Sequence, residues 1–278
     1  MALEQLSLLT GLNKIETAIT ILQAWEPPEG YYFADSGGKD SSAARHLLYK
    51  ANVKFDAHYC VSPIDPKPIH DFLKQHHPET QWDYHARGFW KMVVDKGLPM
   101  RNARWCCQVI KEAGGQDRVV VVGNRRVEGN IRKNQCFIET PQHRNSKGHR
   151  KSTKTFIRPI IDWDNYDIWQ YLRENNISYC YLYDEGATLK SYGKGVFKRL
   201  GCVLCPFSRN IEREELYFPK ITNLWKVACD KIVEATKDRN YITKTGKPVK
   251  NKFTTGEELY QWWTKRDRKH PSPDSIPF

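Results

Sequence analysis

The chain has 278 residues, of which 40% are hydrophobic and 27% charged, a composition typical of a folded globular protein. No stretch approaches the roughly 20 consecutive apolar residues of a membrane-crossing helix, and the N-terminus lacks the features of a signal peptide. We therefore expect a cytoplasmic protein with no membrane partner. Lys and Arg outnumber Asp and Glu by 44 to 32, and this net charge of +12 favours polyanionic partners such as nucleotides or nucleic acid.

The first half of the chain alternates between strand and helix patterns. Apolar spacing predicts an amphipathic helix within residues 1–25 and a short strand over residues 30–35. The turn of residues 36–42, with the sequence SGGKDSS, then leads into a helix. Further along, the same patterns predict a strand at 53–61 and helices at 69–77 and 87–112.

Residues 118–123, RVVVVG, form the clearest buried strand, because a β-branched run ends there at a glycine. Alternating strands and helices predict an α/β fold, a parallel sheet with helices on both faces. In such sheets ligands bind at the carboxyl ends of the strands. The 36–42 turn and the turn at Gly123 both lie at such ends.

Basic residues dominate much of the second half. Residues 142–158 contain six Lys or Arg, two His and no acidic residue, which predicts an exposed loop or hairpin. A helix is expected over residues 162–175, with Asp164 as its N-cap. The remaining sequence is helical, basic and rich in aromatic residues. We therefore divide the chain into a nucleotide-binding domain (1–208) and a basic helical C-terminal region (209–278).

The 36–42 turn has the composition of an anion-binding loop. Glycines let the backbone approach an anion, and the following helix N-terminus, the lysine and the serine hydroxyls add charge and hydrogen bonds. A Walker A loop is absent, and an ordinary capped turn is the alternative. The order of strand, glycines, Lys, Asp and paired serines favours phosphate binding. The candidate ligands are Ser36, Gly37, Gly38, Lys39, Asp40, Ser41 and Ser42.

Four cysteines form a second constellation, an adjacent pair and a Cys-x-x-Cys pair: Cys106, Cys107, Cys202 and Cys205. A Cys-x-x-Cys turn suits a metal or a redox pair. Adjacent cysteine side chains diverge, which suits different irons of one [4Fe–4S] cluster better than one zinc ion. Zinc and free cysteines remain the alternatives. We expect the other four to be packing residues: Cys60, Cys136, Cys180 and Cys229.

The SGGKDSS turn resembles the PP-loop of the ATP pyrophosphatase superfamily, whose members cleave ATP between the α and β phosphates. The cysteine pattern resembles the cluster motifs of bacterial adenylyl-sulfate reductases and of the ATP pyrophosphatases of DNA phosphorothioation (the Dnd and Ssp systems). Segments 158–172 and 182–186 resemble further parts of the phosphoadenylyl-sulfate (PAPS) reductase-like family. Together these resemblances imply a Rossmann-like adenine nucleotide α-hydrolase fold.

Residues 123–132, GNRRVEGNIR, resemble that family's G-x-R-x-x-E-S-x-x-R loop. The resemblance implies that Gly123, Arg125 and Arg132 contact nucleotide phosphate, and that Glu128 orients an arginine. Gly129 stands where the family usually has Ser, so one hydroxyl contact is lost. A solvated basic loop is the alternative.

Reductases of this family carry a nucleophilic cysteine in a C-terminal Glu-Cys-Gly-His-like motif, which does not occur in this sequence. The resemblance therefore implies an ATP pyrophosphatase with a [4Fe–4S] cluster that activates an acceptor for sulfur insertion. ATP would bind with Mg²⁺, and Lys39, Asp40 and Arg125 are the implied catalytic residues.

The implied acceptor is the DNA backbone, and the implied partners are a cysteine desulfurase and other modification-system subunits. Residues 142–158 and 239–270, the latter with Trp262 and Trp263, are candidate DNA contacts. Two alternatives remain. One is an adenylyl-sulfate or phosphoadenylyl-sulfate reductase that uses another cysteine, such as Cys229. The other is a non-catalytic ATP-sensing subunit.

Overall fold

The computed structural model describes residues 3–6, 10–101, 104–141, 153–184, 197, 199–208, 211–237, 241–242, 248–249 and 253–264. The chain divides into two compact units. The sheet unit comprises residues 1–61, 67–84 and 110–200, and the helical unit comprises residues 62–66, 85–109 and 201–278. The C-terminal part of the helical unit begins at residue 201, whereas the predicted boundary lies at residue 208. The prediction also assigns the two earlier segments of this unit, residues 62–66 and 85–109, to the nucleotide-binding domain.

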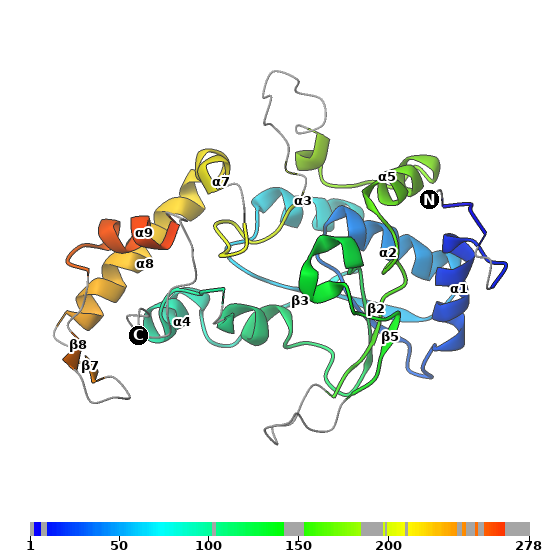
Figure 1. Cartoon of the computed structure of the whole chain (residues 1–278), viewed down its shortest axis with the longest axis horizontal. Helices are drawn as coiled ribbons and strands as arrows, with labels where there is room; N and C mark the ends of the chain where they lie inside the picture. The colour runs from blue at the N-terminus through cyan, green and yellow to red at the C-terminus, as the bar shows by residue number, and fades with distance from the viewer. Residues whose placement is uncertain are drawn as a thin grey trace. The chain divides into compact units, whose positions relative to one another are not determined.

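A six-stranded sheet forms the centre of the sheet unit in the described part of the chain (Figure 1). Neighbouring strands are parallel except for the last pair, which is antiparallel. Their spatial order is β3 (Gln81–Asp83), β2 (Phe55–Cys60), β1 (Tyr31–Ala34), β4 (Val119–Val122), β6 (Thr155–Ile157) and β5 (Ile138–Glu139). The predicted α/β class with a mostly parallel sheet is confirmed.

The strand order contains one reversal. The chain passes from β1 outward through β2 and β3, and then returns to β4 on the other side of β1. The carboxyl ends of β1 and β4 therefore flank the topological switch point, where open α/β sheets bind their ligands. The 36–42 turn follows β1 and the Gly123 turn follows β4.

Three helices share the main core with the sheet: α1 (Lys14–Ala24), α2 (Lys39–Lys50) and α5 (Asn165–Glu174). Alternate strand residues, such as Tyr31, Phe33 and Val121, pack in the same core as Leu22 and Leu47. The other face carries Tyr32 and Val120, against which the backbone of residues 114–115 lies. Because successive strand side chains point to opposite faces, this alternation positions β1 between two packed layers.

Side-chain caps explain where two helices begin. The Asn13 side chain accepts hydrogen bonds from two N–H groups of α1. The Glu16 carboxylate in turn accepts the Asn13 N–H, which completes a capping box. The predicted N-terminal helix is therefore limited to Lys14–Ala24. Asp164 caps α5 in the same way, paired with Asp167, so the predicted N-cap is confirmed.

Two segments differ from the sequence prediction. The helix expected over residues 87–112 is broken into α4 (Phe89–Lys96) and a π-helical turn, η1 (Cys107–Lys111), because Gly97 adopts φ 77° after α4. The basic segment 142–158, predicted as an exposed loop or hairpin, ends in β6, which pairs antiparallel with β5 as in a hairpin but is an inner strand of the sheet. Lys154 donates from its amine to the Glu112 carbonyl (2.5 Å), so its charge is buried with a hydrogen-bond partner.

Among its described residues the sheet unit also contains α3 (Lys67–His76), close to its predicted bounds. The helical unit adds four described elements after residue 208: α7 (Ile211–Tyr217), α8 (Pro219–Thr236), α9 (Gly256–Thr264) and a hairpin of β7 (Tyr241–Ile242) and β8 (Pro248–Val249). The predicted helical C-terminal region is thus confirmed. No helix within the described ranges is long and apolar enough to cross a membrane.

Tryptophans form the centre of the helical unit. The rings of Trp225 and Trp263 lie 4.6 Å apart, and Phe89 and Trp90 pack edge-on against Trp225. Trp263 is only 1% exposed and donates to the Pro99 carbonyl. The sequence prediction that Trp263 offers a surface for stacking nucleic-acid bases is therefore wrong, because its ring is used in the core. Trp262 packs against Phe253 instead.

Candidate functional site

The predicted turn of residues 36–42 comprises the loop after β1 and the first turn of α2, which begins at Lys39, and it contains a glycine that other residues could not replace without strain. Gly37 has φ +67°, in the left-handed region that favours glycine. A Cβ placed on it would lie 2.8 Å from Cγ2 of Ile69. The loop can therefore turn tightly against α3 only because this side chain is missing.

Gly37→Ala is expected to lower the free energy of unfolding by about 1–3 kcal/mol, since it combines backbone strain with overpacking. Urea denaturation would measure the loss. The matched control is Gly129→Ala, because Gly129 is extended and a Cβ there meets nothing within 4 Å. Equal stability of the two variants would contradict the assigned role of Gly37.

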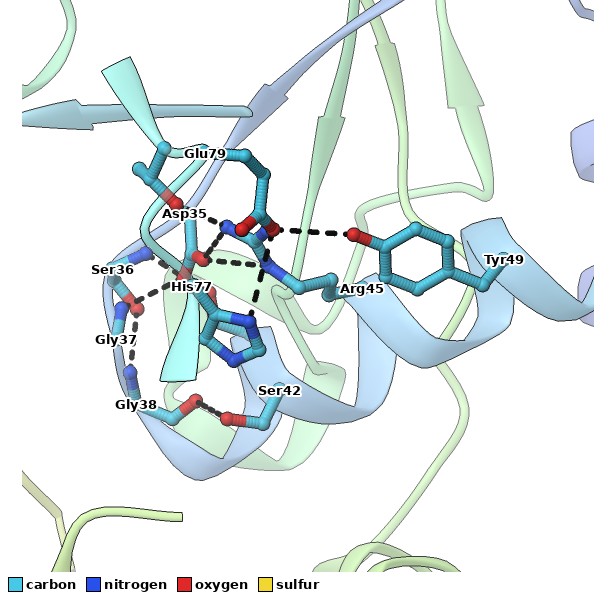
Figure 2. Close-up of polar contacts among 11 residues, drawn as sticks. Asp35, Ser36, Gly37, Gly38, Ser42, Arg45, Tyr49, His77 and Glu79 are labelled. Atoms are coloured by element: carbon cyan, nitrogen blue, oxygen red, sulfur yellow. Dashed lines mark hydrogen bonds and ion pairs between the residues drawn. The ribbon is translucent and has the colours of Figure 1, made fainter. Parts of the chain in front are cut away.

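The Asp35 carboxylate holds the loop in place through hydrogen bonds. Its Oδ1 accepts the Gly37 N–H (2.8 Å) and the Ser41 hydroxyl (2.6 Å), and its Oδ2 accepts Nε (3.0 Å) and Nη2 (2.5 Å) of Arg45. Figure 2 shows Asp35 between the loop and Arg45. Both side chains of this ion pair are at most 2% exposed. The loop is thus fixed by a buried ion pair that the sequence analysis did not identify.

Arg45 extends this network to the segment before β3. Its guanidinium also donates to Glu79 and to Oγ1 of Thr80 (2.6 Å). Tyr49 donates to the same Glu79 carboxylate (3.2 Å), as Figure 2 shows. Arg45 therefore joins the phosphate loop, α2 and the turn after α3 through one buried side chain.

The serine hydroxyls of the loop bond within the loop itself. Ser41 accepts the Ser36 N–H (2.9 Å), and Ser42 donates to the Gly38 carbonyl (3.3 Å). Ser36 Oγ accepts the Gly38 N–H at 3.4 Å. The predicted phosphate ligands Ser36, Ser41 and Ser42 therefore shape the loop in this structure, and their contact with phosphate stays a prediction.

The three residues predicted to be catalytic lie together. Lys39 Nζ lies 2.8 Å from Oδ2 of Asp40, and Arg125 Nε lies 2.7 Å from Oδ1 of the same carboxylate. Lys39 and Arg125 are each 2% exposed. Burial lowers the pKa of the Lys39 amine, Asp40 opposes this shift, and Arg125 adds to it. The site thus holds two buried cations on one carboxylate, a charge arrangement suited to an anionic ligand.

The segment after β4 brings Arg125 to this point. A Cβ on Gly123 would lie 3.1 Å from the backbone of Asp40, so the two carboxyl-end turns pack closely. The Arg125 guanidinium also donates to Oδ1 of Asn165 (2.9 Å), at the start of α5. The turns at the carboxyl ends of β1 and β4, where the sequence analysis places both, therefore lie side by side.

Arg132 occupies a more peripheral position in the same segment. It lies on η3 (Asn130–Arg132) and forms an ion pair with Glu128 of η2 (Arg126–Glu128). Glu128 also accepts the Arg125 N–H (3.2 Å). The prediction that Glu128 orients an arginine agrees with this geometry. A phosphate contact of Arg132 stays a prediction.

The four clustered cysteines lie in the helical unit. Leu204, inside the Cys-x-x-Cys turn, has φ +58°, which is a rare conformation for a bulky residue. Glu214 accepts the Leu204 N–H (2.6 Å), and the Cys205 N–H donates to the Cys202 carbonyl. Such strain is tolerated where the surrounding structure holds it, and it occurs most often at functional sites.

The thiols of these four cysteines influence one another. A hydrogen bond to Cys107 raises the pKa of Cys106, and burial and the charges of Cys107, Cys202 and Cys205 raise it further. None of the four forms a disulfide bond in the structure. Among the described side chains, no three His, Cys, Asp or Glu are arranged to hold a single metal ion. The neighbouring thiols therefore disfavour ionisation of Cys106, and a bound cation would offset this effect.

A glycine turn at the switch point of a parallel sheet, with two buried cations beside it, is typical of nucleotide-binding α/β proteins. Residues 30–208 match the phosphoadenosine phosphosulfate reductase domain, and the chain belongs to this family. The prediction of a PAPS reductase-like domain is thereby confirmed.

Its relatives include several kinds of protein. An uncharacterized protein from Methanocaldococcus jannaschii, MJ0973, is 28% identical over 68% of this chain and 45% of its own length. A probable FAD synthase of Schizosaccharomyces pombe is 33% identical over 65% of this chain and 67% of its own. An adenosine 5′-phosphosulfate reductase of Oceanobacillus iheyensis is 26% identical over 46% of this chain and 44% of its own. The chain spans less than half the length of MJ0973.

Two solved structures superpose in part on this chain. The PAPS reductase of Candida auris superposes with a TM-score of 0.47 at 15% identity, covering 70% of this chain and 90% of its own. Candida glabrata FMN adenylyltransferase, in complex with FMN and the ATP analogue AMPCPP, superposes with a TM-score of 0.45 at 19% identity, covering 68% of this chain and 63% of its own.

Proposed function

We propose that this chain is an ATP pyrophosphatase, which cleaves ATP between the α and β phosphates and leaves an activated adenylylated acceptor. The observation that carries the proposal is the meeting of Lys39, Asp40 and Arg125 at the phosphate loop. Two buried cations there would stabilise the negative charge that develops on departing pyrophosphate. Preorganised charges of this kind supply much of the rate enhancement in phosphoryl-type transfers.

Asp40 is the residue best placed to bind Mg²⁺ with the nucleotide. Its Oδ1 is buried and forms an ion pair with Arg125 (2.7 Å) but makes no hydrogen bond with the described residues. Carboxylate oxygens are preferred Mg²⁺ ligands, and nucleotide phosphates complete the coordination. The ion would neutralise charge on the pyrophosphate, while Lys39 and Arg125 hold the same group from the protein side.

The named relatives support an adenine nucleotide as the substrate. FAD and adenosine 5′-phosphosulfate, the compounds in the names of two relatives, both contain an adenosine 5′-phosphoryl group. We extend this chemistry to the present chain, in which the acceptor oxygen would attack the α-phosphate and release pyrophosphate. The adenylylated group is then open to displacement of AMP by sulfur.

The acceptor we propose is the DNA backbone, with sulfur supplied by a cysteine desulfurase partner as in the phosphorothioation systems. The net charge of +12 supports a polyanionic partner. Most residues of the two candidate DNA-binding segments lie outside the described residues. Cys106, Cys107, Cys202 and Cys205 would hold a [4Fe–4S] cluster, which would supply redox or sulfur-handling chemistry.

The structure disfavours Cys229 as the nucleophile of a sulfonucleotide reductase. This thiol is 0% exposed, and burial raises its pKa to about 12. A reductase needs a reachable thiolate to attack sulfur, because the thiolate and not the thiol is the nucleophile. This observation favours ATP cleavage over the reductase alternative that uses Cys229.

The test is incubation of anaerobically purified protein with Mg·ATP, resolving AMP from ADP and quantifying pyrophosphate. We expect AMP and pyrophosphate in equal amounts, reduced by about a hundredfold or more in Lys39→Ala and in Asp40→Ala. Lys50→Ala is the matched control, because Lys50 is exposed at the other end of α2. Formation of ADP, or AMP formation that survives both site variants, would refute the proposal.

Two further assays separate the alternatives. Thioredoxin-dependent release of sulfite from adenylyl sulfate would identify a reductase. Tight ATP binding without turnover, even with partner subunits present, would identify an ATP-sensing subunit.

Binding to duplex DNA over a salt series tests the proposed acceptor, because the affinity from contacts with the phosphate backbone must weaken as the salt concentration rises.

A further inference from the structure

A buried tyrosine stands beside the N-terminus of α2. Tyr183 lies on η4 (Tyr181–Tyr183) and is 2% exposed. Its hydroxyl accepts the backbone N–H of Lys39 at 3.2 Å. A Cβ placed on Gly38 would lie 3.2 Å from the same oxygen, so the hydroxyl lies directly against the phosphate loop.

The hydroxyl proton is not used by the described residues. The oxygen accepts the N–H of Lys39 and is also hydrogen bonded to the N–H of Leu200. No described residue accepts a hydrogen bond from it. Burial raises the pKa of Tyr183, and the charge of Asp40 adds to the shift. The group therefore stays protonated and can act only as a neutral hydrogen-bond donor toward a ligand.

Neighbouring aromatic rings fix the orientation of this side chain. Trp169 packs edge-on against the Tyr183 ring with centroids 5.8 Å apart, and Tyr179 packs against it at 6.5 Å. The Lys39 ammonium lies 5.7 Å from the ring centroid. The hydroxyl is thus held by packing on one side and by the loop backbone on the other.

We propose that Tyr183 binds the nucleotide by donating its hydroxyl proton to a phosphate oxygen held in the 36–42 loop. This inference rests on the proposed function and adds a ligand from outside the loop and its arginine. The Lys39 N–H polarises the hydroxyl, and hydrogen bonds in such a chain strengthen one another. The partial positive charge of the α2 N-terminus thereby polarises the Tyr183 hydroxyl and strengthens its hydrogen bond to the anion.

The alternative is that Tyr183 only caps the Lys39 N–H. The two roles predict opposite effects of Tyr183→Phe. If the hydroxyl only caps, its loss exposes an N–H that can donate to the anion itself, so anion affinity stays equal or rises. If the hydroxyl is a ligand, anion affinity falls.

The experiment is calorimetric titration of wild-type protein and Tyr183→Phe with inorganic pyrophosphate and with Mg·AMPCPP, whose α–β linkage resists cleavage. We expect about tenfold weaker binding of both probes, the effect of one hydrogen bond to a charged group. Tyr179→Phe is the matched control, because it removes a hydroxyl from the same aromatic cluster that bonds Asp184 instead. Its affinity should equal that of the wild type.

The outcomes separate this inference from the proposed function. Equal or tighter binding by a folded Tyr183→Phe would overturn the inference and leave ATP cleavage intact. Failure of wild-type protein to bind either probe would overturn both. A parallel loss in Tyr179→Phe would assign the effect to the aromatic packing and would likewise overturn the role of the Tyr183 hydroxyl.

Discussion

Arg45→Met is expected to lower the free energy of unfolding by about 3–5 kcal/mol, because it leaves the buried carboxylate of Asp35 without its cation. Both oxygens of Asp35 are engaged, one by the loop and the other by Arg45. Methionine keeps most of the volume but supplies no charge and no hydrogen bond. The loss is therefore electrostatic, and packing contributes little to it.

Chemical denaturation followed by circular dichroism would measure this effect. The matched control is Lys67→Met in the same unit, since Lys67 and Asp71 form an exposed pair with side chains 81% and 53% exposed. Such a pair contributes less than about 1 kcal/mol. Arg45→Lys should be intermediate, because lysine keeps the charge but loses the paired donors of the guanidinium. If Arg45→Met proved as stable as the control, the anchoring role of the ion pair would be wrong.

The same variant should also weaken pyrophosphate binding. The Gly37 N–H and the Ser41 hydroxyl take their orientation from Asp35, and Arg45 holds Asp35 in place (Figure 2). Arg45 is thus a positioning residue that acts on the anion only through the loop. Gly37 and Arg45 therefore constrain the loop in two ways, the first through backbone conformation and the second through charge.

The phosphate loop was predictable because its information is local. Glycines, lysine and serines follow a strand within seven consecutive residues, and their chemistry does not depend on distant contacts. The buried network beneath the loop was not predictable in the same way. Arg45 and Glu79 are 34 positions apart, and only the packing of α2 near the turn after α3 brings them together. Tyr183 was missed for the same reason, since it meets Lys39 across 144 positions.

The fold predictions were wrong where local composition and tertiary packing disagree. Residues 142–158 are strongly basic, which predicts an exposed loop or hairpin. The hairpin is present, since β6 pairs antiparallel with β5, but β6 is an inner strand between β4 and β5. Thr155–Ile157 suits a strand, and the neighbouring Lys154 finds a carbonyl partner in the interior. The helix expected over residues 87–112 is similarly interrupted by Gly97, whose left-handed conformation ends α4. The apolar spacing on the two sides of Gly97 still follows a helical period, so the sequence pattern alone did not reveal the break.

Cys202→Ser is expected to abolish binding of the proposed cluster, the largest spectroscopic change that we predict. Anaerobic reconstitution of the wild type with iron and sulfide should give about four irons per chain and the visible absorption of a [4Fe–4S] cluster. Serine keeps the size of the side chain but replaces the soft thiolate that iron–sulfur clusters require. The hydrogen bond from the Leu204 N–H to Glu214 fixes the turn that carries Cys202 and Cys205.

Cys136→Ser is the matched control, because Cys136 is exposed and belongs to the sheet unit. It should keep full iron content and absorption. Cys107, burial and the charges of Cys202 and Cys205 raise the pKa of Cys106, so a bound cationic group would favour its thiolate. Four neighbouring thiols either stay protonated or, as thiolates, bind a common cationic group. Iron retained by Cys202→Ser would contradict the cluster. One zinc ion per chain without visible absorption would also contradict it and would identify zinc as the bound ion.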